Sequence, residues 1–496
     1  MDTTNILTAP MPIRRYPGRI AVLLGLVALA DFLIFGEMPG INLFFFALAV
    51  CAGILLPAMK GLSPSTAALL LGLSLLASAP LLETPSVMGF ALCLSALMSV
   101  ALVSGKLMPR SLNGLPLVFS RFGLVIPLRL AEDVGKYLAT PANRSSLTEV
   151  RRSAGLWVMP LILASVFLLL FAAANPVIEV TLRSIRFDVL LQFLDPWRIG
   201  FWIMTAAVVW ALLRPRLKRR FARLQAERAF MIVPTKNSPL GHASLLRSLL
   251  LFNTLFAVQT VLDLVYLWAG ADLPDHMSHA EYAHRGAYPL IATALLAAGF
   301  VLLAMRPDGP GDKSSLIRRL VYAWIGQNIL LCLSSMLRLE LYVEAYSLTE
   351  LRVAAGLWMG IVAIGLALIL LRIVLNRSNE WLIATNLASL IAVLYISAFI
   401  DFPAVIARFN VAHSQEISQE GLPLDLNYLS SLGPSVIPAL DLYLLKLPDQ
   451  LIDQRSQAVT VRYYLARNFE MRRRDWRNWT FRAARLESYL LSPIAR

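Results

Sequence analysis

The chain has 496 residues, of which 57% are hydrophobic and only 15% are Asp, Glu, Lys or Arg. Soluble chains carry about 25% charged residues, and a water-soluble core cannot bury this much apolar surface, so an ordinary soluble domain is excluded. The net charge of +14 does not indicate nucleic-acid binding, because its Lys and Arg gather in the connections between apolar runs, where membrane topology requires them.

Apolar runs of membrane-spanning length recur along the chain. A hydrocarbon layer about 30 Å thick needs roughly 20 helical residues to cross it. We therefore predict an all-α fold, a polytopic transmembrane helical bundle of about 11 spans with a small helical extracytoplasmic C-terminal tail. The predicted spans are residues 20–35, 41–59, 64–82, 87–104, 154–174, 199–213, 248–268, 287–305, 320–337, 353–371 and 381–400.

The distribution of basic residues predicts the orientation, because cytoplasmic connections retain Lys and Arg. With the N-terminus inside, the cytoplasmic segments hold 27 Lys and Arg and the external connections hold six. The remaining 12 follow residue 400. We expect a multi-pass protein of a bacterial inner (cytoplasmic) membrane, with a cytoplasmic N-terminus and an extracytoplasmic C-terminus.

The connections divide the chain into segments. Residues 1–19 are the predicted cytoplasmic N-terminus, and residues 20–305 hold spans 1–8 with a cytoplasmic amphipathic segment at 106–153. A Gly/Pro-rich cytoplasmic linker at 306–319 precedes spans 9–11 at 320–400, and the helical tail covers 401–496. Two alternatives stay open: a crossing within 106–153, which would invert everything downstream, and cleavage after an Ala28-Leu29-Ala30 signal-like site.

Three polar side chains share one face of the seventh predicted span. Gln259, Asp263 and Tyr266 fall within about 60° of one another at 100° per residue. A carboxylate inside the bilayer is costly unless it is paired or hydrated. Asp263 is therefore either a functional group or the partner of a neighbouring helix.

The predicted connection after this span is rich in ionisable groups. It contains His276, His279 and His284 beside Glu281 and Arg285. Imidazoles and carboxylates can bind zinc, but Glu281 and His284 at three-residue spacing also permit an ion pair or a proton relay. We therefore predict no metal site here.

A further polar stretch follows the ninth predicted span, where Arg338 and Tyr342 share a helical face. The stated topology puts this stretch on the same side as Asp31, Asp263 and His284. We hypothesise a polar cavity in the outer leaflet in which arginines neutralise carboxylates. Its candidate residues are Asp31, Gln259, Asp263, Tyr266, Glu281, His284, Arg285, Arg338 and Tyr342.

No spacing indicates a catalytic or cofactor site. The sequence lacks a Gly-rich phosphate loop, a Gly-x-Ser-x-Gly elbow and a His-Glu-x-x-His motif. Cys51, Cys93 and Cys332 lie within apolar runs and do not have metal-ligand spacing. We predict no catalytic residues, metal or cofactor; the expected partners are the lipid bilayer, anionic lipid headgroups and envelope proteins.

Four stretches carry a family resemblance: LDLVYLWAGADLPDHMSHAEYAHRGAYPLIATALLAAGFVL, RLELYVEAYSLTELRVAAGLWMG, LDLNYLSSLGPSVIPAL and DWRNWTFRAARLESYL. Over residues 150–490 the chain resembles an uncharacterised family of bacterial polytopic membrane proteins, catalogued only as a domain of unknown function. The residues that match its pattern are Glu281, Tyr282, His284, Arg285, Gly286, Arg338, Tyr342, Tyr346 and Arg352. The resemblance implies an integral membrane protein and transfers no activity.

Three classes of function remain open. The leading hypothesis is a non-enzymatic envelope protein that senses or scaffolds through its external parts, because polar residues gather there without a catalytic motif. A proton-linked secondary transporter or permease would use Asp31, Asp263 and His284. A membrane-embedded enzyme would use His284 or Glu281 as acid or base.

Overall fold

The computed structural model describes residues 17–109, 114–138, 156–157, 159–168, 195–215, 242–269, 314–472 and 475–493. Within these ranges all regular structure is helical. The chain divides into two compact units, which we describe separately. The second unit includes Pro80–Gly89 besides the C-terminal half of the chain.

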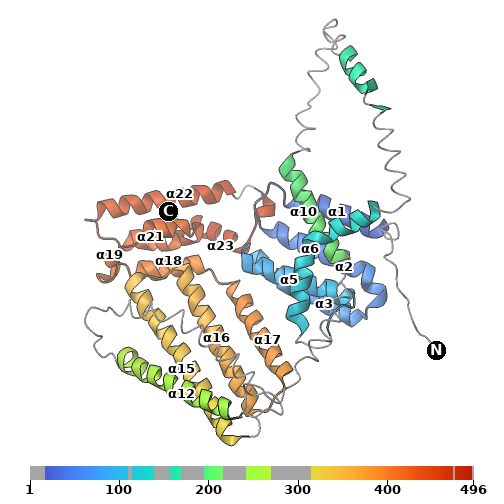
Figure 1. The fold of residues 1–496 in the computed structure, drawn as a ribbon. Coiled ribbons are helices and arrows are strands. Elements are labelled where there is room, and N and C mark those ends of the chain that lie inside the picture. Colours follow the sequence, from blue (N-terminus) through green and yellow to red (C-terminus); the bar gives the residue numbers. More distant parts are fainter. Residues whose placement is uncertain are drawn as a thin grey trace, which may run out of the picture. The chain divides into compact units, whose positions relative to one another are not determined.

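In the first unit, α10 contacts α1, α2 and α6 (Figure 1). Helix α10 packs against α1 and α6, and α2 packs against α1 and α3. The turn between α1 and α2 is closed by Asn42, whose buried side-chain amide donates to the Leu33 carbonyl over 2.8 Å. The helices are α1 (Pro17–Leu33), α2 (Ile41–Ala58), η2 (Met59–Gly61), α3 (Pro64–Ser78), α5 (Val87–Ser104, which begins in the second unit), α6 (Leu115–Leu138) and α10 (Pro196–Leu213).

Long apolar helices form one part of the second unit. Each packs against the next described helix, and Figure 1 shows α15, α16 and α17 side by side. Their core contains Trp324, against which the Phe252 ring stacks with centroids 5.2 Å apart. The helices are α12 (His242–Asp263) with the π-helical η4 (Leu264–Trp268), α15 (Ser315–Tyr346), α16 (Glu350–Val374) and α17 (Asn379–Ser397).

Short polar side chains start these helices. Thr349 caps α16 by accepting from the Arg352 amide, and Ser378 caps α17 by accepting from the Trp381 amide. Ser314 caps α15 in the same way, so α15 begins at Ser315 and the last residues of the predicted 306–319 linker are helical.

The remaining helices of the second unit follow residue 401, and we call them the C-terminal helices. They have their own core, in which Leu429, Ile437, Leu440 and Tyr443 are fully buried. Helix α18 packs against α16, α21 against α18, and α22 against α21. The C-terminal helices are α18 (Phe402–Ala412), α19 (Gln415–Ser418), α20 (Leu426–Ser431), η5 (Pro434–Val436), α21 (Ile437–Lys446), α22 (Ile452–Arg472), η6 (Trp476–Asn478) and α23 (Phe481–Leu490).

Eight helices in the described ranges are long and apolar enough to cross a membrane. One of them, Pro64–Glu83, joins α3 to the short α4 (Pro80–Glu83), and α1 is only 17 residues long. The predicted span 287–305 lies outside the described residues, and only part of the span 154–174 is described, as the apolar helix Met159–Leu168. The predicted total of eleven spans therefore stays a prediction.

Candidate functional site

A buried ion pair joins α12 to α15. Asp263 is 2% exposed and Arg338 is 3% exposed. Nη2 of Arg338 donates to Oδ1 of Asp263, and Nε2 of Gln259 donates to the same oxygen over 2.9 Å. Gln259 precedes Asp263 by one helical turn, so both side chains leave α12 on one face.

The second carboxylate oxygen of Asp263 is buried and has no hydrogen-bond partner among the described residues. An unsatisfied buried acceptor costs about 1–3 kcal/mol, and more when it is charged. Desolvating an ion pair also costs several kcal/mol per ion, which the mutual attraction offsets only when the geometry is good. This oxygen is therefore the position at which the pair can accept a proton or another hydrogen-bond donor.

A π-helical turn begins immediately after Asp263. Its widened geometry is shown by the bond from the Ala269 amide to the Leu264 carbonyl, 2.9 Å long. Within it, Nε1 of Trp268 donates to Oγ of Ser334 on α15 over 3.2 Å, and Tyr266 is half-buried. π-Helical turns inside α-helices are frequent at functional sites.

Tyr342 lies one turn beyond Arg338 and contacts the start of α16. The Arg352 guanidinium lies 4.5 Å from its ring centroid, and the Tyr346 ring lies 4.9 Å from it. Nη1 of Arg352 also donates to the carbonyls of Tyr346 and Ser347. Arg352 thus fastens the turn between α15 and α16 through a cation–π contact and two charge-assisted hydrogen bonds.

Asp31 belongs to the first unit and has partners of its own. Nε of Arg198 donates to Asp31 Oδ1 over 2.7 Å, while Nη2 donates to Oδ2. Nε1 of Trp202 donates to Oδ1 over 2.8 Å, and the guanidinium lies 5.3 Å from the Phe35 ring centroid. This bidentate pair fastens α1 to the N-terminal end of α10.

The other end of α10 holds a second aspartate. Asp133 of α6 accepts from Nε1 of Trp210 over 3.0 Å and from Nη1 of Arg214 over 2.8 Å. Neither Asp133 nor these pairings was predicted from the sequence. The signal was present: an Arg and a Trp four residues apart, on one helical face, stand at each end of α10.

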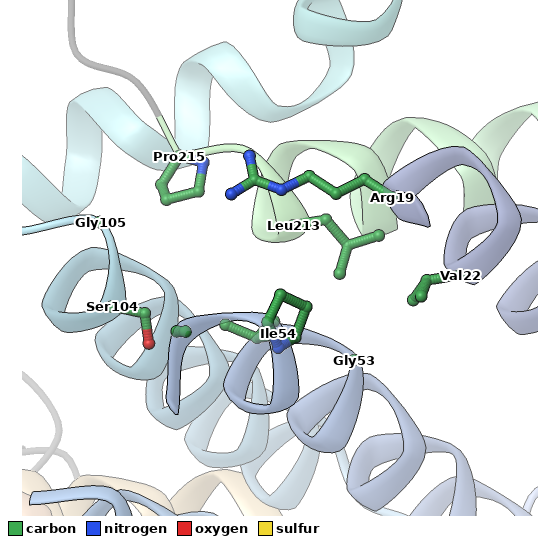
Figure 2. A pocket seen from close by; sticks show the side chains of 10 residues that line it. Arg19, Val22, Gly53, Ile54, Ser104, Gly105, Leu213 and Pro215 are labelled. Carbon is green, nitrogen blue, oxygen red and sulfur yellow. The ribbon is translucent and has the colours of Figure 1, made fainter. Parts of the chain in front are cut away.

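A cavity of about 50 Å³ lies in the first unit, where four helix ends meet (Figure 2). The C-terminal ends of α2, α5 and α10 carry partial negative charge, which the guanidinium of Arg19 in α1 complements. The size suits a few water molecules. The lining residues are Arg19, Val22, Gly53, Ile54, Pro57, Ala58, Ser104, Gly105, Leu213 and Pro215.

Polar contacts attach the C-terminal helices to the turn between α15 and α16. The Leu348 amide donates to Oδ1 of Asn410 over 2.7 Å, and Nδ2 of Asn410 returns a bond to the Leu348 carbonyl over 3.0 Å. The Glu350 amide donates to the Tyr428 hydroxyl over 2.9 Å. Because both groups of the Asn410 amide are used, α18 is held to this turn in one orientation.

A second attachment in the same unit involves the short helix α4. Arg485 of α23 donates to both carboxylate oxygens of Glu83, whose side chain is 7% exposed. Nε of Arg482 lies 3.5 Å from Glu83 and 3.3 Å from Asp401. Glu83 raises the pKa of Arg485 through this hydrogen bond, which keeps the charged form bound.

Three of the predicted cavity residues, Glu281, His284 and Arg285, lie outside the described residues, as do His276 and His279. The part of the chain that the structure describes contains no group of three His, Cys, Asp or Glu able to hold a metal ion. The structure brings together Gln259, Asp263 and Arg338. It gives Asp31 different partners, and the shared cavity remains a prediction.

Within the described residues, eight apolar helices of spanning length, with carboxylates neutralised between helices, define the class as a helical membrane protein. A family model described as "Domain of unknown function (DUF4153)" matches residues 44–443. The chain belongs to this family, and the resemblance noted in the sequence is confirmed. The match begins much earlier than residue 150 and ends within α21. Comparisons with curated proteins and with solved structures gave no match.

Proposed function

We propose that this protein is a non-enzymatic sensing or scaffolding protein of the bacterial inner membrane, which uses its C-terminal helices to engage envelope proteins. The observation that carries the proposal is that these helices have a separate core and are fixed to the ends of long apolar helices. Such an arrangement holds a folded surface at a set position beside the bilayer.

The attachments support an extracytoplasmic location for the C-terminal helices. Glu83 and the Leu348–Glu350 turn both fall in connections that the basic-residue count assigns to the outside. In the first unit, the basic-residue count assigns each helix end around the cavity to the cytoplasmic side. These agreements favour about 11 spans, a cytoplasmic N-terminus and an extracytoplasmic residue range 401–496.

Helix α22 offers the surface for a partner. Helix α22 packs on α21, which packs on α18, and α18 packs on α16. Helix α22 therefore lies on the side of the C-terminal helices that is away from α16 (Figure 1). Its side chains Tyr463 and Tyr464 are 63% and 61% exposed, and Arg467 is also exposed. Tyr and Arg are the residue types that protein interfaces favour.

Photo-crosslinking in intact cells tests the scaffolding proposal. A photoreactive amino acid at the exposed position Thr460 should give discrete crosslinked envelope proteins. The double variant Tyr463→Ser/Tyr464→Ser should abolish them, whereas Ser456→Ala/Gln457→Ala on the same helix should leave them unchanged. Identical crosslinks in all three proteins, or none in the parent, would contradict the proposal.

One observation favours a second candidate, a proton-linked secondary transporter. The buried Asp263 oxygen without a partner among the described residues lies beside a π-helical turn and a paired arginine, as a protonatable transport group requires. Uptake of an isotope-labelled metabolite extract into proteoliposomes should then depend on a pH gradient and disappear in Asp263→Asn. Gradient-independent accumulation, or none in the parent protein, would reject transport.

A further inference from the structure

Helix α6 places two charged side chains on its packed face. Its packed face carries Val118, Phe122 and Ile126, and continues with the buried charges of Arg129 and Asp133. These positions recur at spacings of three and four residues, so they form one stripe. The stripe packs against α10.

One exposed arc of α6 carries no charge. Leu124 and Leu128 are 74% and 64% exposed, and they stand on an arc with Ser120, Pro127 and Ala131 that contains no ionisable group. A helix on a water-soluble surface shows the opposite pattern, with charges outward and apolar residues inward. Apolar side chains that face outward beside buried charges indicate that the medium around this face is hydrocarbon.

The two ends of α6 indicate how it lies. Its C-terminal part is held by the bonds of Asp133 to Trp210 and Arg214, at the C-terminal end of α10. Ser104 and Gly105, at the end of α5, line the same cavity as Leu213 of α10, so these helix ends share one side. Only a short polar connection, residues 105–114, separates α5 from α6, and such a segment is not tolerated across the hydrocarbon layer.

We propose that α6 is an in-plane membrane helix, embedded in the leaflet that surrounds the C-terminal ends of α5 and α10. The face of α6 that carries Leu124 and Leu128 contacts lipid acyl chains. The hydrogen bonds of Asp133 hold α6 against α10. The proposed site is a surface of α6 that contacts lipid. This proposal is independent of the function proposed for the C-terminal helices. Two of the charged side chains that end the apolar run of α6, Arg129 and Asp133, are turned toward the protein.

Spin labelling in liposomes tests this assignment. In full-length protein with Cys51, Cys93 and Cys332 replaced by alanine, nitroxides would be attached to Leu124→Cys and Leu128→Cys. Both labels should collide more often with oxygen, which concentrates in lipid, than with a water-soluble nickel chelate. A label on the exposed Ser456→Cys should show the reverse order. Preferential collision of the α6 labels with the chelate would overturn the proposal.

A charge introduced on the same face provides an independent measurement. Leu128→Asp should lower the recovery of folded protein from membranes several-fold, because the new carboxylate would face hydrocarbon. Ser456→Asp should not change it. Equal recovery of Leu128→Asp and the parent protein would contradict a lipid-facing position.

Discussion

Three buried or partly buried carboxylates bind arginines that come from other parts of the chain. Asp31, Asp133 and Asp263 each pair with an arginine, and each also accepts from a Trp or Gln side chain. An arginine neutralises the charge, while the additional donor satisfies part of the remaining acceptor capacity. Each pair therefore stabilises the fold only when both partners are present.

Breaking the Asp263–Arg338 pair from one side should be costly. Asp263→Leu should lower the free energy of unfolding by about 3–5 kcal/mol, because Arg338 is left buried without its counter-ion. The double variant Asp263→Leu/Arg338→Met should lose clearly less than the single variant. Denaturation of the detergent-solubilised protein measures both, and a double variant that is less stable than Asp263→Leu would refute the coupling.

The tyrosines of the C-terminal helices should make stability fall at high pH. Burial raises the pKa of Tyr489 to about 12, and its hydrogen bond to Asp441 Oδ2, 3.0 Å long, acts in the same direction. Burial also raises the pKa of Tyr443 to about 12. Because the folded values exceed the ordinary value of about 10, this contribution is complete below pH 10 and is lost as the pH rises to 12.

Tyr489→Phe isolates one of these contributions. The difference in tyrosinate absorbance between the parent and the variant should titrate near pH 12, and the variant should lose less stability than the parent between pH 10 and 12. If this absorbance difference titrated near pH 10 instead, Tyr489 would be exposed to solvent and the prediction would be wrong.

At the scale of the element, hydrophobicity predicts where apolar helices lie better than where they end. The predicted span 87–104 has the same bounds as α5, whereas the predicted span 320–337 lies within the 32-residue helix α15. Arg318 and Glu340 end the apolar run but not the helix, since both are good helix formers. Helix α15 stops at Ser347, where φ is 68°.

The pairings of these helices could not be predicted from one sequence. Gln259 and Asp263 were expected to share a face because their spacing fixes it, and they are hydrogen bonded. The Asp133–Arg214 pair is 81 residues apart, and its prediction requires knowing that α6 lies against α10. The tail at 401–496 was predicted to be helical, but Gly433, with φ of 88°, and Pro434 interrupt the helices between α20 and α21.

The close approach of α5 and α10 gives an element-scale prediction. A Cβ at Gly105 would stand 2.8 Å from Cγ of Pro215, so Gly105→Ala must displace one helix end. We expect a loss of about 1–3 kcal/mol, measured by thermal unfolding in detergent. Gly200→Ala is the matched control, because its Cβ meets nothing within 4 Å, and it should be neutral or stabilising. Equal stability of the two variants would show that the contact is not tight.

At the scale of the whole molecule, the proposed function requires apolar helices that cross the bilayer and leave the C-terminal helices outside the cell membrane. The chain belongs to the family matched over residues 44–443, and the attachments at Glu83 and Leu348 associate the C-terminal helices with predicted external connections. A scaffolding role in the envelope requires this sidedness.

Labelling of single cysteines in intact cells measures the sidedness directly. In a background without Cys51, Cys93 and Cys332, a membrane-impermeant maleimide should modify Ser456→Cys on α22 in unbroken cells. It should modify Lys106→Cys, at the end of α5, only after the membrane is permeabilised. Modification of Ser456→Cys that also required permeabilisation would contradict the account.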